Sequence, residues 1–356
     1  MRPEHRIAVL RANGIGDLVF ALPALDALRA AYPESEIVFL GLPWHRSFFD
    51  GRPSPIDRVE VVPAWPGVRD GEPDRNEQDA FFGRMRAERF DLAIQMHGGG
   101  RNSNPMVRAL GAVRTVGLQA EDAPPLDINV PYRYFQSEVQ RCLEVVSLVG
   151  APALGAHPHL CVTTADLAEA RGALPGERQP LVVLNPGAGD GRRRWPPEKF
   201  AAVGRRLVRA GARVAITGAF SDAPLGAAIR ESLPEAVDLT GALSLGGLVG
   251  LYSQCALVVS NDSGPLHLAE AVGTPTVGLY WCGNVINAGP ATRTAHRVML
   301  SWRLRCPVCR VDCMRGACAH DASFIADISV REVADEALDL LAGATIARPL
   351  PVAAPA

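Results

Sequence analysis

Residues 5–33, HRIAVLRANGIGDLVFALPALDALRAAYP, contain a strand, a turn and a helix in direct succession. Residues 7–10 are a continuous apolar run of strand length. Gly14 and Gly16 follow, where glycine would let the backbone turn sharply, and apolar residues then recur at helical spacing. Pro23 lies inside that helical pattern, so a kink or a restart is expected there. This order predicts the first unit of a parallel α/β domain.

The alternation of strands and helices continues along the chain and then starts again. In the first half, strands are predicted at EIVFLG (36–41), VEVVP (59–63) and DLAIQMHG (91–98), with a helix around residues 138–149. The segment 150–166 is rich in Pro and Gly and is typical of a link between domains. In the second half, strands are predicted at LVVLN (181–185), ARVAITG (212–218), ALVVSN (256–261) and TPTVGLYW (274–281). Two Rossmann-like, doubly wound domains are the simplest interpretation.

These patterns predict the domain boundaries. We expect an N-terminal domain over residues 1–160, a C-terminal domain over 175–330, and an amphipathic helix over 331–345 that packs back on the N-terminal domain. The last residues, ARPLPVAAPA (347–356), are expected to form a frayed tail. Ligands of doubly wound sheets bind beside the turns that follow the strands, so a cleft between the two domains is expected.

Composition restricts the class of protein. The chain has 356 residues, of which 48% are hydrophobic and 21% charged, and its formal net charge is −2. These values indicate a globular protein without a general attraction to nucleic acid. No apolar run approaches the ~20 residues of a membrane span, and the N-terminus does not have the pattern of a signal peptide. A cytoplasmic location is therefore expected. The GxxxxGK[ST] and GxSxG motifs are missing, which argues against a nucleoside triphosphatase or a serine hydrolase.

Asp17, which follows the first glycine turn, is the first candidate catalytic residue. One interpretation is a helix N-cap, a common role worth about 1 kcal/mol. The other is a carboxylate presented to substrate as a general base. A dinucleotide fingerprint does not fit, because Val19 stands where GxGxxG would require its third glycine.

A second candidate is the turn NPGAGDGRRRWPPEKF (185–200), which combines glycines with three arginines ahead of a predicted helix. Gly187 and Ala188 lie in the turn, and Arg193 lies beside the helix start. Backbone N–H groups and guanidinium groups in this arrangement favour an anionic phosphate. The alternative is a solvated arginine loop.

The third candidate, VVSNDSGPLH (258–267), ends a predicted strand and begins a helix. Asp262 and Ser263 can hydrogen-bond sugar hydroxyls, and the Ser263 and Gly264 amides would lie at a helix N-terminus that favours negative charge. His267 would contact a phosphate or would be a core histidine. A carboxylate repels a diphosphate, so Asp262 is expected to hold hydroxyls or to order the loop.

Four of the eight cysteines lie in CPVCRVDCMRGAC (306–318). Their spacing is C-x2-C-x3-C-x4-C, and they are Cys306, Cys309, Cys313 and Cys318. In a cytoplasmic chain this spacing indicates a metal before disulfides. Four thiolates can surround a structural Zn²⁺, with His320 as a substitute ligand. Thiols packed without metal, or disulfides, are the alternatives, and no catalytic role is expected.

Taken together, several motifs resemble glycosyltransferase family 9, the bacterial ADP-heptose:lipopolysaccharide heptosyltransferases. The motifs are GD followed by an apolar segment with Pro23, RFDLAIQMHG (89–98), the PGA and RWP turn (186–196), TGALSLGGL (240–248) and NDSGPLHLAEAVGTPTVGL (261–279). The last is long and irregular, and it is the most specific. Family members commonly carry lysine where this chain has Arg193, which keeps the charge and changes the geometry.

The resemblance implies a GT-B fold, in which two Rossmann-like domains face a central cleft. It implies inverting transfer of heptose from ADP-heptose to a lipid-linked lipopolysaccharide inner-core acceptor, with Asp17 as the general base. The second and third candidate turns would bind the donor, and Gly14, Gly16 and Arg101 would lie on the acceptor side. Catalysis would require no cofactor and would occur at the cytoplasmic face of the inner membrane, through peripheral contact. The alternatives are a nucleotide-sugar epimerase of similar fold and a catalytically inactive nucleotide-sugar-binding protein.

Overall fold

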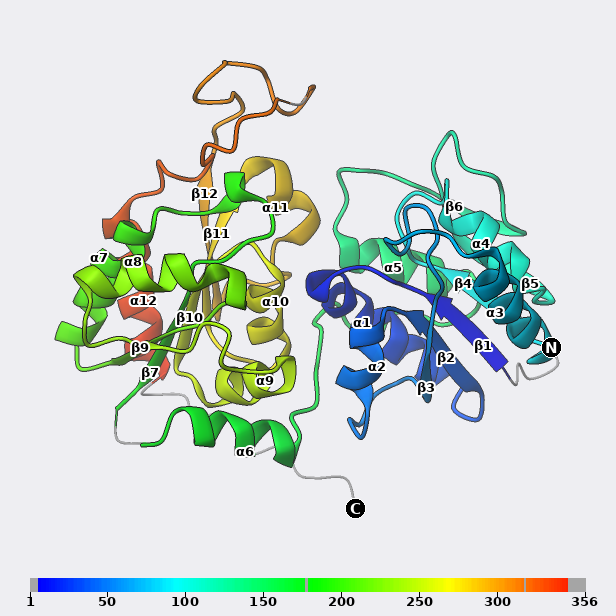
Figure 1. The fold of residues 1–356 in the computed structure, drawn as a ribbon, viewed down its shortest axis with the longest axis horizontal. Coiled ribbons are helices and arrows are strands. Elements are labelled where there is room, and N and C mark those ends of the chain that lie inside the picture. The colour runs from blue at the N-terminus through cyan, green and yellow to red at the C-terminus, as the bar shows by residue number, and fades with distance from the viewer. Residues whose placement is uncertain (1–5, 177–178, 317, 345–356) are drawn as a thin grey trace. The chain divides into compact units, whose positions relative to one another are not determined.

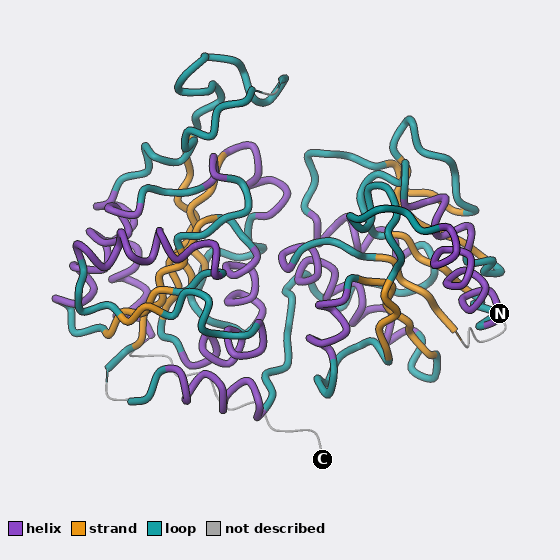
Figure 2. Tube along the Cα trace, in the orientation of Figure 1, coloured by secondary structure: helices purple, strands orange, loops and turns teal. Residues whose placement is uncertain are grey.

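The computed structural model of the chain describes residues 6–176, 179–316 and 318–344. The chain divides into two compact units, Met1–Cys161 with Ile286–Ala288, and Val162–Val285 with Gly289–Ala356. The main boundary falls inside the Pro- and Gly-rich segment expected to link two domains. In each unit the strands form a central layer between helices (Figure 2).

The first unit contains a six-stranded sheet in the order β3-β2-β1-β4-β5-β6, and its strand pairs are parallel. This is the Rossmann strand order. The strands are β1 (Arg6–Leu10), β2 (Glu36–Gly41), β3 (Arg58–Val61), β4 (Leu92–Gln95), β5 (Arg114–Gln119) and β6 (Ile128–Pro131). The helices are α1 (Ile15–Ala31), α2 (Pro43–Phe49), α3 (Arg75–Ala87), α4 (Ser103–Ala109) and α5 (Glu138–Ser147) (Figure 1).

The turn from β1 into α1 differs from the prediction in two respects. α1 is a single helix that continues through Pro23, so the expected restart does not occur. Pro23 and its neighbours are buried and the helix packs against α5, which offsets the hydrogen bond that proline removes. Gly14 is the N-cap with φ −78°, and Gly16 is not among the described residues with positive φ. The sharp turn therefore does not depend on the left-handed conformation that glycine permits.

The second unit repeats the architecture, with the order β12-β11-β10-β7-β8-β9 and parallel pairs throughout its sheet. The strands are β7 (Leu181–Asn185), β8 (Arg213–Ile216), β9 (Val237–Asp238), β10 (Leu257–Asn261), β11 (Thr276–Trp281) and β12 (His296–Ser301). The helices are α6 (Thr164–Ala173), α7 (Pro197–Arg209), α8 (Ala223–Ser232), α9 (Leu245–Gln254), α10 (Gly264–Ala271), α11 (Cys282–Ala288) and α12 (Val330–Ala344).

The C-terminal helix α12 packs on the second unit, which corrects the expectation that it would return to the N-terminal domain. Its buried residues belong to the core formed by β7, β8, β10, β11 and α7, and they are Val333, Ala334, Ala337 and Leu340. Figure 1 shows the helix beside this sheet. The apolar face of α12 is thus used inside one domain core. The predicted frayed tail lies outside the described residues.

Both sheets end in turns that carry candidate site residues. The turn with the predicted Asp17 follows β1 and also contains Arg11, and His97 follows β4; Arg11 and His97 were not predicted. In the second unit, the turns after β7 and β10 carry the arginines and the Asp262 to His267 segment. Among the described residues, no helix is long and apolar enough to cross a membrane.

Candidate active site

In the first unit, Asp17 forms an ion pair with the buried Arg11. The guanidinium Nη2 of Arg11 lies 2.9 Å from Asp17 Oδ1, and its Nε donates to the Asp17 carbonyl at 3.2 Å. Arg11 is 2% exposed, whereas the Asp17 side chain is 39% exposed. Asp17 lies in the first turn of α1 and is not its N-cap, which is Gly14. The carboxylate is therefore held from the protein side and open on the other.

A second carboxylate holds Arg11 from α5. Glu138 Oε2 accepts from Arg11 Nη2 at 3.2 Å, and Glu138 Oε1 pairs with the buried Arg141. Burial disfavours the charged form of Arg11, but Cys142, Asp17 and Glu138 outweigh it and raise the pKa of Arg11 above its ordinary value. Two cations and two carboxylates thus form a compensated cluster, in which Arg11 stays protonated at any physiological pH.

His97 fixes the same turn from the end of β4. Its Nδ1 accepts from the Ala12 amide at 3.1 Å, and its Nε2 lies 2.9 Å from the Gly67 carbonyl. Burial is the main reason that the pKa of His97 is lowered, with Arg11 adding to the effect. The neutral ring therefore carries its proton on Nε2 and donates it to Gly67. This histidine is structural support for the turn.

Of the residues expected on the acceptor side, Gly14 and Gly16 lie with the Arg11 cluster, whereas Arg101 does not. Gly14 and Gly16 precede Asp17 in the turn that joins it to Arg11, and a Cβ on Gly14 would lie 3.6 Å from Asp17 Oδ2. Arg101 lies in another loop, is 74% exposed and pairs with Asp122 at 3.3 Å. An exposed pair of this kind contributes little to stability, so Arg101 is free to exchange Asp122 for another anion.

In the second unit, Asn261 joins two of the predicted turns at the end of β10. Its Nδ2 donates to the Pro186 carbonyl at 2.7 Å, and its Oδ1 accepts from the Trp195 amide at 3.1 Å. Trp195 is buried, and its indole Nε1 donates to the Ile328 carbonyl. The arginine turn and the 258–267 segment are therefore held together by buried hydrogen bonds.

The three arginines of this turn have three different partners. Arg192 donates to both oxygens of Asp190 at 2.7–3.1 Å, which occupies its guanidinium locally. Arg194 Nε donates to the Ala188 carbonyl at 2.9 Å. Arg193 instead crosses to the 258–267 segment, where its Nη1 lies 3.3 Å from the Asp262 carbonyl and 3.4 Å from Asp262 Oδ2. Its side chain is 28% exposed. Arg193 is thus anchored to the turn after β10 while remaining accessible.

Asp262 lies at the centre of a buried charge network. His267 Nε2 is 3.3 Å from Asp262 Oδ1, and Asn284 Nδ2 donates to Oδ2 at 3.1 Å. His267 Nδ1 is also 3.3 Å from Glu270. Burial opposes ionisation of Asp262, but His267, Arg193 and Asn284 outweigh it and lower its pKa. Burial likewise opposes the charged form of His267, yet Asp262 and Glu270 raise the pKa of His267 to about 9.

This network favours one of the two roles expected for Asp262. Its side chain is only 2% exposed, and its carboxylate is occupied by protein partners. The geometry therefore supports ordering of the loop and of Arg193 over direct contact with hydroxyls. Because His267 is equally buried and cationic, it neutralises the carboxylate from within the unit.

The remaining predicted donor residues include Ser263 and Gly264 at the start of α10 and Gly187 in the arginine turn. Ser263 is the N-cap of α10, and Gly264 is the first residue of that helix. Gly187 is required for packing, because a Cβ there would meet the Asp222 carboxylate at 2.3 Å. The chain at this position thus lies directly against Asp222, whose Oδ2 accepts from the Ala219 amide at 2.9 Å.

A buried polar ladder between the strand ends was not predicted. Asn185 lies between Ser260 at 3.3 Å and Thr217 at 3.3 Å, and Thr217 Oγ1 is 3.2 Å from the Tyr252 hydroxyl. Arg11 and Glu138 were also missed. A charged residue directly after a buried strand, as in LRANG, is the sequence signal that could have identified Arg11.

The structure brings together three of the four clustered cysteines. The ligand atoms of Cys306, Cys309, Cys318 and His320 lie within 4.8 Å of one another. Cys313 is outside this set: its Sγ is 4.0 Å from that of Cys318 and donates to the Val311 carbonyl. His320, the substitute ligand in the sequence interpretation, takes the fourth place.

Comparison with solved structures confirms the fold. The E. coli ADP-heptose lipopolysaccharide heptosyltransferase II superposes with a TM-score of 0.72 at 20% identity, covering 95% of this chain and 99% of that one. A glycosyltransferase family 9 protein of Veillonella parvula superposes with a TM-score of 0.77 at 21% identity, covering 96% and 99%. The two Rossmann-like units therefore have the GT-B type of fold.

The sequence comparisons identify the family. The sequence model of glycosyltransferase family 9 (heptosyltransferase) matches residues 79–315. The chain is 27% identical over 296 residues to lipooligosaccharide heptosyltransferase 2 of Haemophilus influenzae. The aligned region covers 77% of this chain and 82% of that protein. It is 24% identical over 297 residues to lipopolysaccharide heptosyltransferase 2 of E. coli K12, with the same coverage. The protein belongs to glycosyltransferase family 9, which confirms the resemblance.

The buried His267 gives stability a defined pH dependence. Its pKa rises from 6.5 to about 9 on folding, so its contribution is complete below pH 6.5 and is lost as pH rises through 9. We expect the free energy of unfolding of the wild type to fall by a few kcal/mol across this window. The melting temperature should fall with it. His267→Gln should be less stable at pH 6 and much less sensitive to pH. The exposed His157→Gln is the control, and an equal pH slope in wild type and His267→Gln would contradict the network.

Proposed function

We propose that the protein is an inverting heptosyltransferase that moves heptose from ADP-heptose to a lipopolysaccharide inner-core acceptor. The family assignment and the heptosyltransferase names of its relatives support the substrate class. Two structures of E. coli heptosyltransferase WaaC, with ADP and with ADP-2-deoxy-2-fluoro heptose, share the fold at 20% identity. The observation that carries the proposal is the half-exposed Asp17 carboxylate held by the buried Arg11.

Asp17 would act as the general base. Its Oδ1 is bound to Arg11, and no protein partner of Oδ2 is found among the described residues. Oδ2 is therefore available to accept the proton of the acceptor hydroxyl as that oxygen attacks the anomeric carbon. A carboxylate is a weak base towards an alcohol, so the proton would move late, when the forming bond has acidified the hydroxyl.

The second unit would bind the donor. Arg193 supplies a positive charge that is anchored by Asp262 and still accessible, and α10 begins beside it at Gly264. Guanidinium groups and helix N-termini both stabilise phosphate oxygens. As the diphosphate leaves, this positive charge would compensate the negative charge that develops on it. His267 would neutralise Asp262, so that the buried carboxylate does not repel the donor.

The acceptor in this proposal is linked to lipid, so the enzyme would work at the cytoplasmic face of the inner membrane through peripheral contact. The transfer itself would use no cofactor. A zinc ion in the cysteine loop would have a structural role, because the transfer depends on residues of other turns.

Replacing the proposed base tests its role directly. Asp17→Asn keeps the shape and an acceptor oxygen for Arg11 but cannot take a proton, so kcat should fall by about 10²–10⁴-fold. The affinity for ADP-heptose should stay within a few-fold, as measured by titration calorimetry. Asp79→Asn, which changes an exposed carboxylate of α3 in the same unit, is the matched control. Retention of more than a tenth of wild-type kcat, or loss of donor binding, would show that Asp17 is not the base.

The neighbouring arginines provide a matched pair for the donor site. Arg193→Ala should raise the donor KM by roughly ten-fold or more, since a charge-assisted hydrogen bond contributes about 1.5–3 kcal/mol. Arg192→Ala should change the KM by less than about three-fold, because Asp190 already occupies that guanidinium. Initial rates over a series of donor concentrations measure both values. Equal effects of the two substitutions on the donor KM would contradict the assignment of Arg193 to donor binding.

A further inference from the structure

The loop that follows β12 is closed by backbone hydrogen bonds, although it extends beyond the sheet. Residues 302–316 extend from the end of β12 beyond the second sheet (Figure 1). An antiparallel bridge joins Arg305 to Asp312, and the Cys306 amide donates to the Val311 carbonyl at 2.9 Å. The Arg310 amide donates to the Cys306 carbonyl at 3.0 Å. These bonds close a tight turn that contains Cys306 and Cys309.

The turn includes a backbone conformation that requires support. Arg310 has φ +64°, in the left-handed region that non-glycine residues rarely adopt. Such residues persist where the surrounding structure holds them. The strained residue directly follows Cys309. The turn thus brings Cys309 back towards Cys306, and their ligand atoms lie within 4.8 Å of each other.

Hydrophobic packing does not explain the order of this loop. Its large apolar side chains are exposed, and they are Trp302 (74%), Leu304 (46%), Val308 (59%) and Val311 (39%). A segment without a core of its own needs another source of stability, such as a disulfide or a metal. Cys306, by contrast, is completely buried, although it is part of the same turn.

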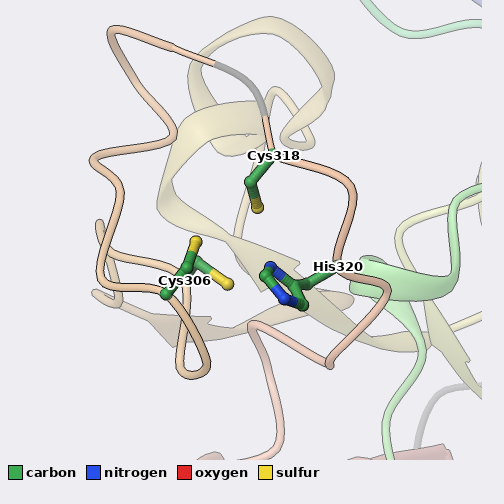
Figure 3. Close-up of side chains that lie close together, drawn as sticks. Cys306, Cys318 and His320 are labelled. Carbon is green, nitrogen blue, oxygen red and sulfur yellow. The ribbon is translucent and has the colours of Figure 1, made fainter.

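The side chains that converge on the turn have the chemistry of a metal site. Cys318 and His320 come from the returning chain and point towards Cys306 (Figure 3). With Cys309, their ligand atoms lie within 4.8 Å of one another. A tetrahedral zinc with Zn–S bonds of about 2.3 Å needs sulfur atoms roughly 3.8 Å apart. A small inward movement of the side chains would therefore complete the coordination.

We propose that Cys306, Cys309, Cys318 and His320 bind one structural Zn²⁺ ion. Three thiolates and one imidazole are a tetrahedral donor set that favours zinc over the oxygen-preferring Mg²⁺ and Ca²⁺. Four protein ligands leave no open position for water or substrate, so the ion holds the loop and takes no part in transfer. Binding releases the thiol protons, and three thiolates with one Zn²⁺ leave a single net negative charge at the site.

The metal content of the purified chain tests this site independently of transfer. Protein prepared without chelators under reducing conditions should contain about one zinc per chain by inductively coupled plasma mass spectrometry. Replacement of zinc by Co²⁺ should give the visible d–d bands of tetrahedral cobalt and a thiolate-to-cobalt charge-transfer band. Cys318→Ser and His320→Asn should each lose most of the zinc, and chelation of the wild type should lower the melting temperature.

Cys313→Ser is the matched control, because Cys313 lies in the same loop but outside the ligand set. It should keep about one zinc per chain. Circular dichroism of every variant shows whether the two units remain folded, so loss of metal is not confused with unfolding. The proposal is overturned by wild-type protein that binds no zinc with its thiols reduced, by iron in place of zinc, or by a Cys313–Cys318 disulfide. Metal loss in Cys313→Ser with retention in His320→Asn would also overturn this ligand set.

Discussion

The buried guanidinium of Arg11 is the interaction on which the N-terminal site depends. It joins the end of β1 to Asp17 in α1, to Glu138 in α5, and to the Met96 carbonyl after β4. A buried charge is tolerated only when it is paired and hydrogen-bonded, and Arg11 meets both conditions. Removing it would leave two carboxylates facing each other. The same contacts hold the Asp17 carboxylate in one orientation with one oxygen open, which is what a general base requires.

The second unit has a comparable arrangement in which the charges are reversed. There the buried group is the Asp262 carboxylate, which is compensated by His267 and anchors the accessible Arg193. In each unit a fully buried ion of one charge fixes a partly exposed ion of the other charge at the carboxyl end of a parallel sheet. Asp17 is suited to accepting a proton and Arg193 to binding an anion. This division is consistent with acceptor activation in one unit and donor binding in the other.

The sequence predicted those features that depend on neighbours along the chain. Strand, turn and helix at β1 and α1, and again at β10 and α10, follow from local apolar patterns and turn residues. Arg11 pairs with Asp17 nearby, but it was missed because the second carboxylate that lets it be buried, Glu138, is 127 residues away. Asp262 was expected to hold hydroxyls or to order the loop, and its hydrogen bond from Arg193, 69 residues away, could not be seen locally. The amphipathic pattern of α12 showed an apolar face but not the core that it joins. Cysteine spacing indicated a metal site, whereas the choice of His320 over Cys313 depends on the path of the returning chain.

The proposed reaction is a single displacement in which an acceptor hydroxyl, activated by Asp17, replaces ADP at the anomeric carbon. The most direct measurement follows ADP release from ADP-heptose of defined anomeric configuration, with and without a heptose-deficient core acceptor. Nuclear magnetic resonance then gives the configuration of the new glycosidic bond. For a single displacement, we expect ADP to appear only with acceptor, in equal amount to product, and the configuration to be inverted. Retained configuration, or ADP release of equal rate without acceptor, would contradict it.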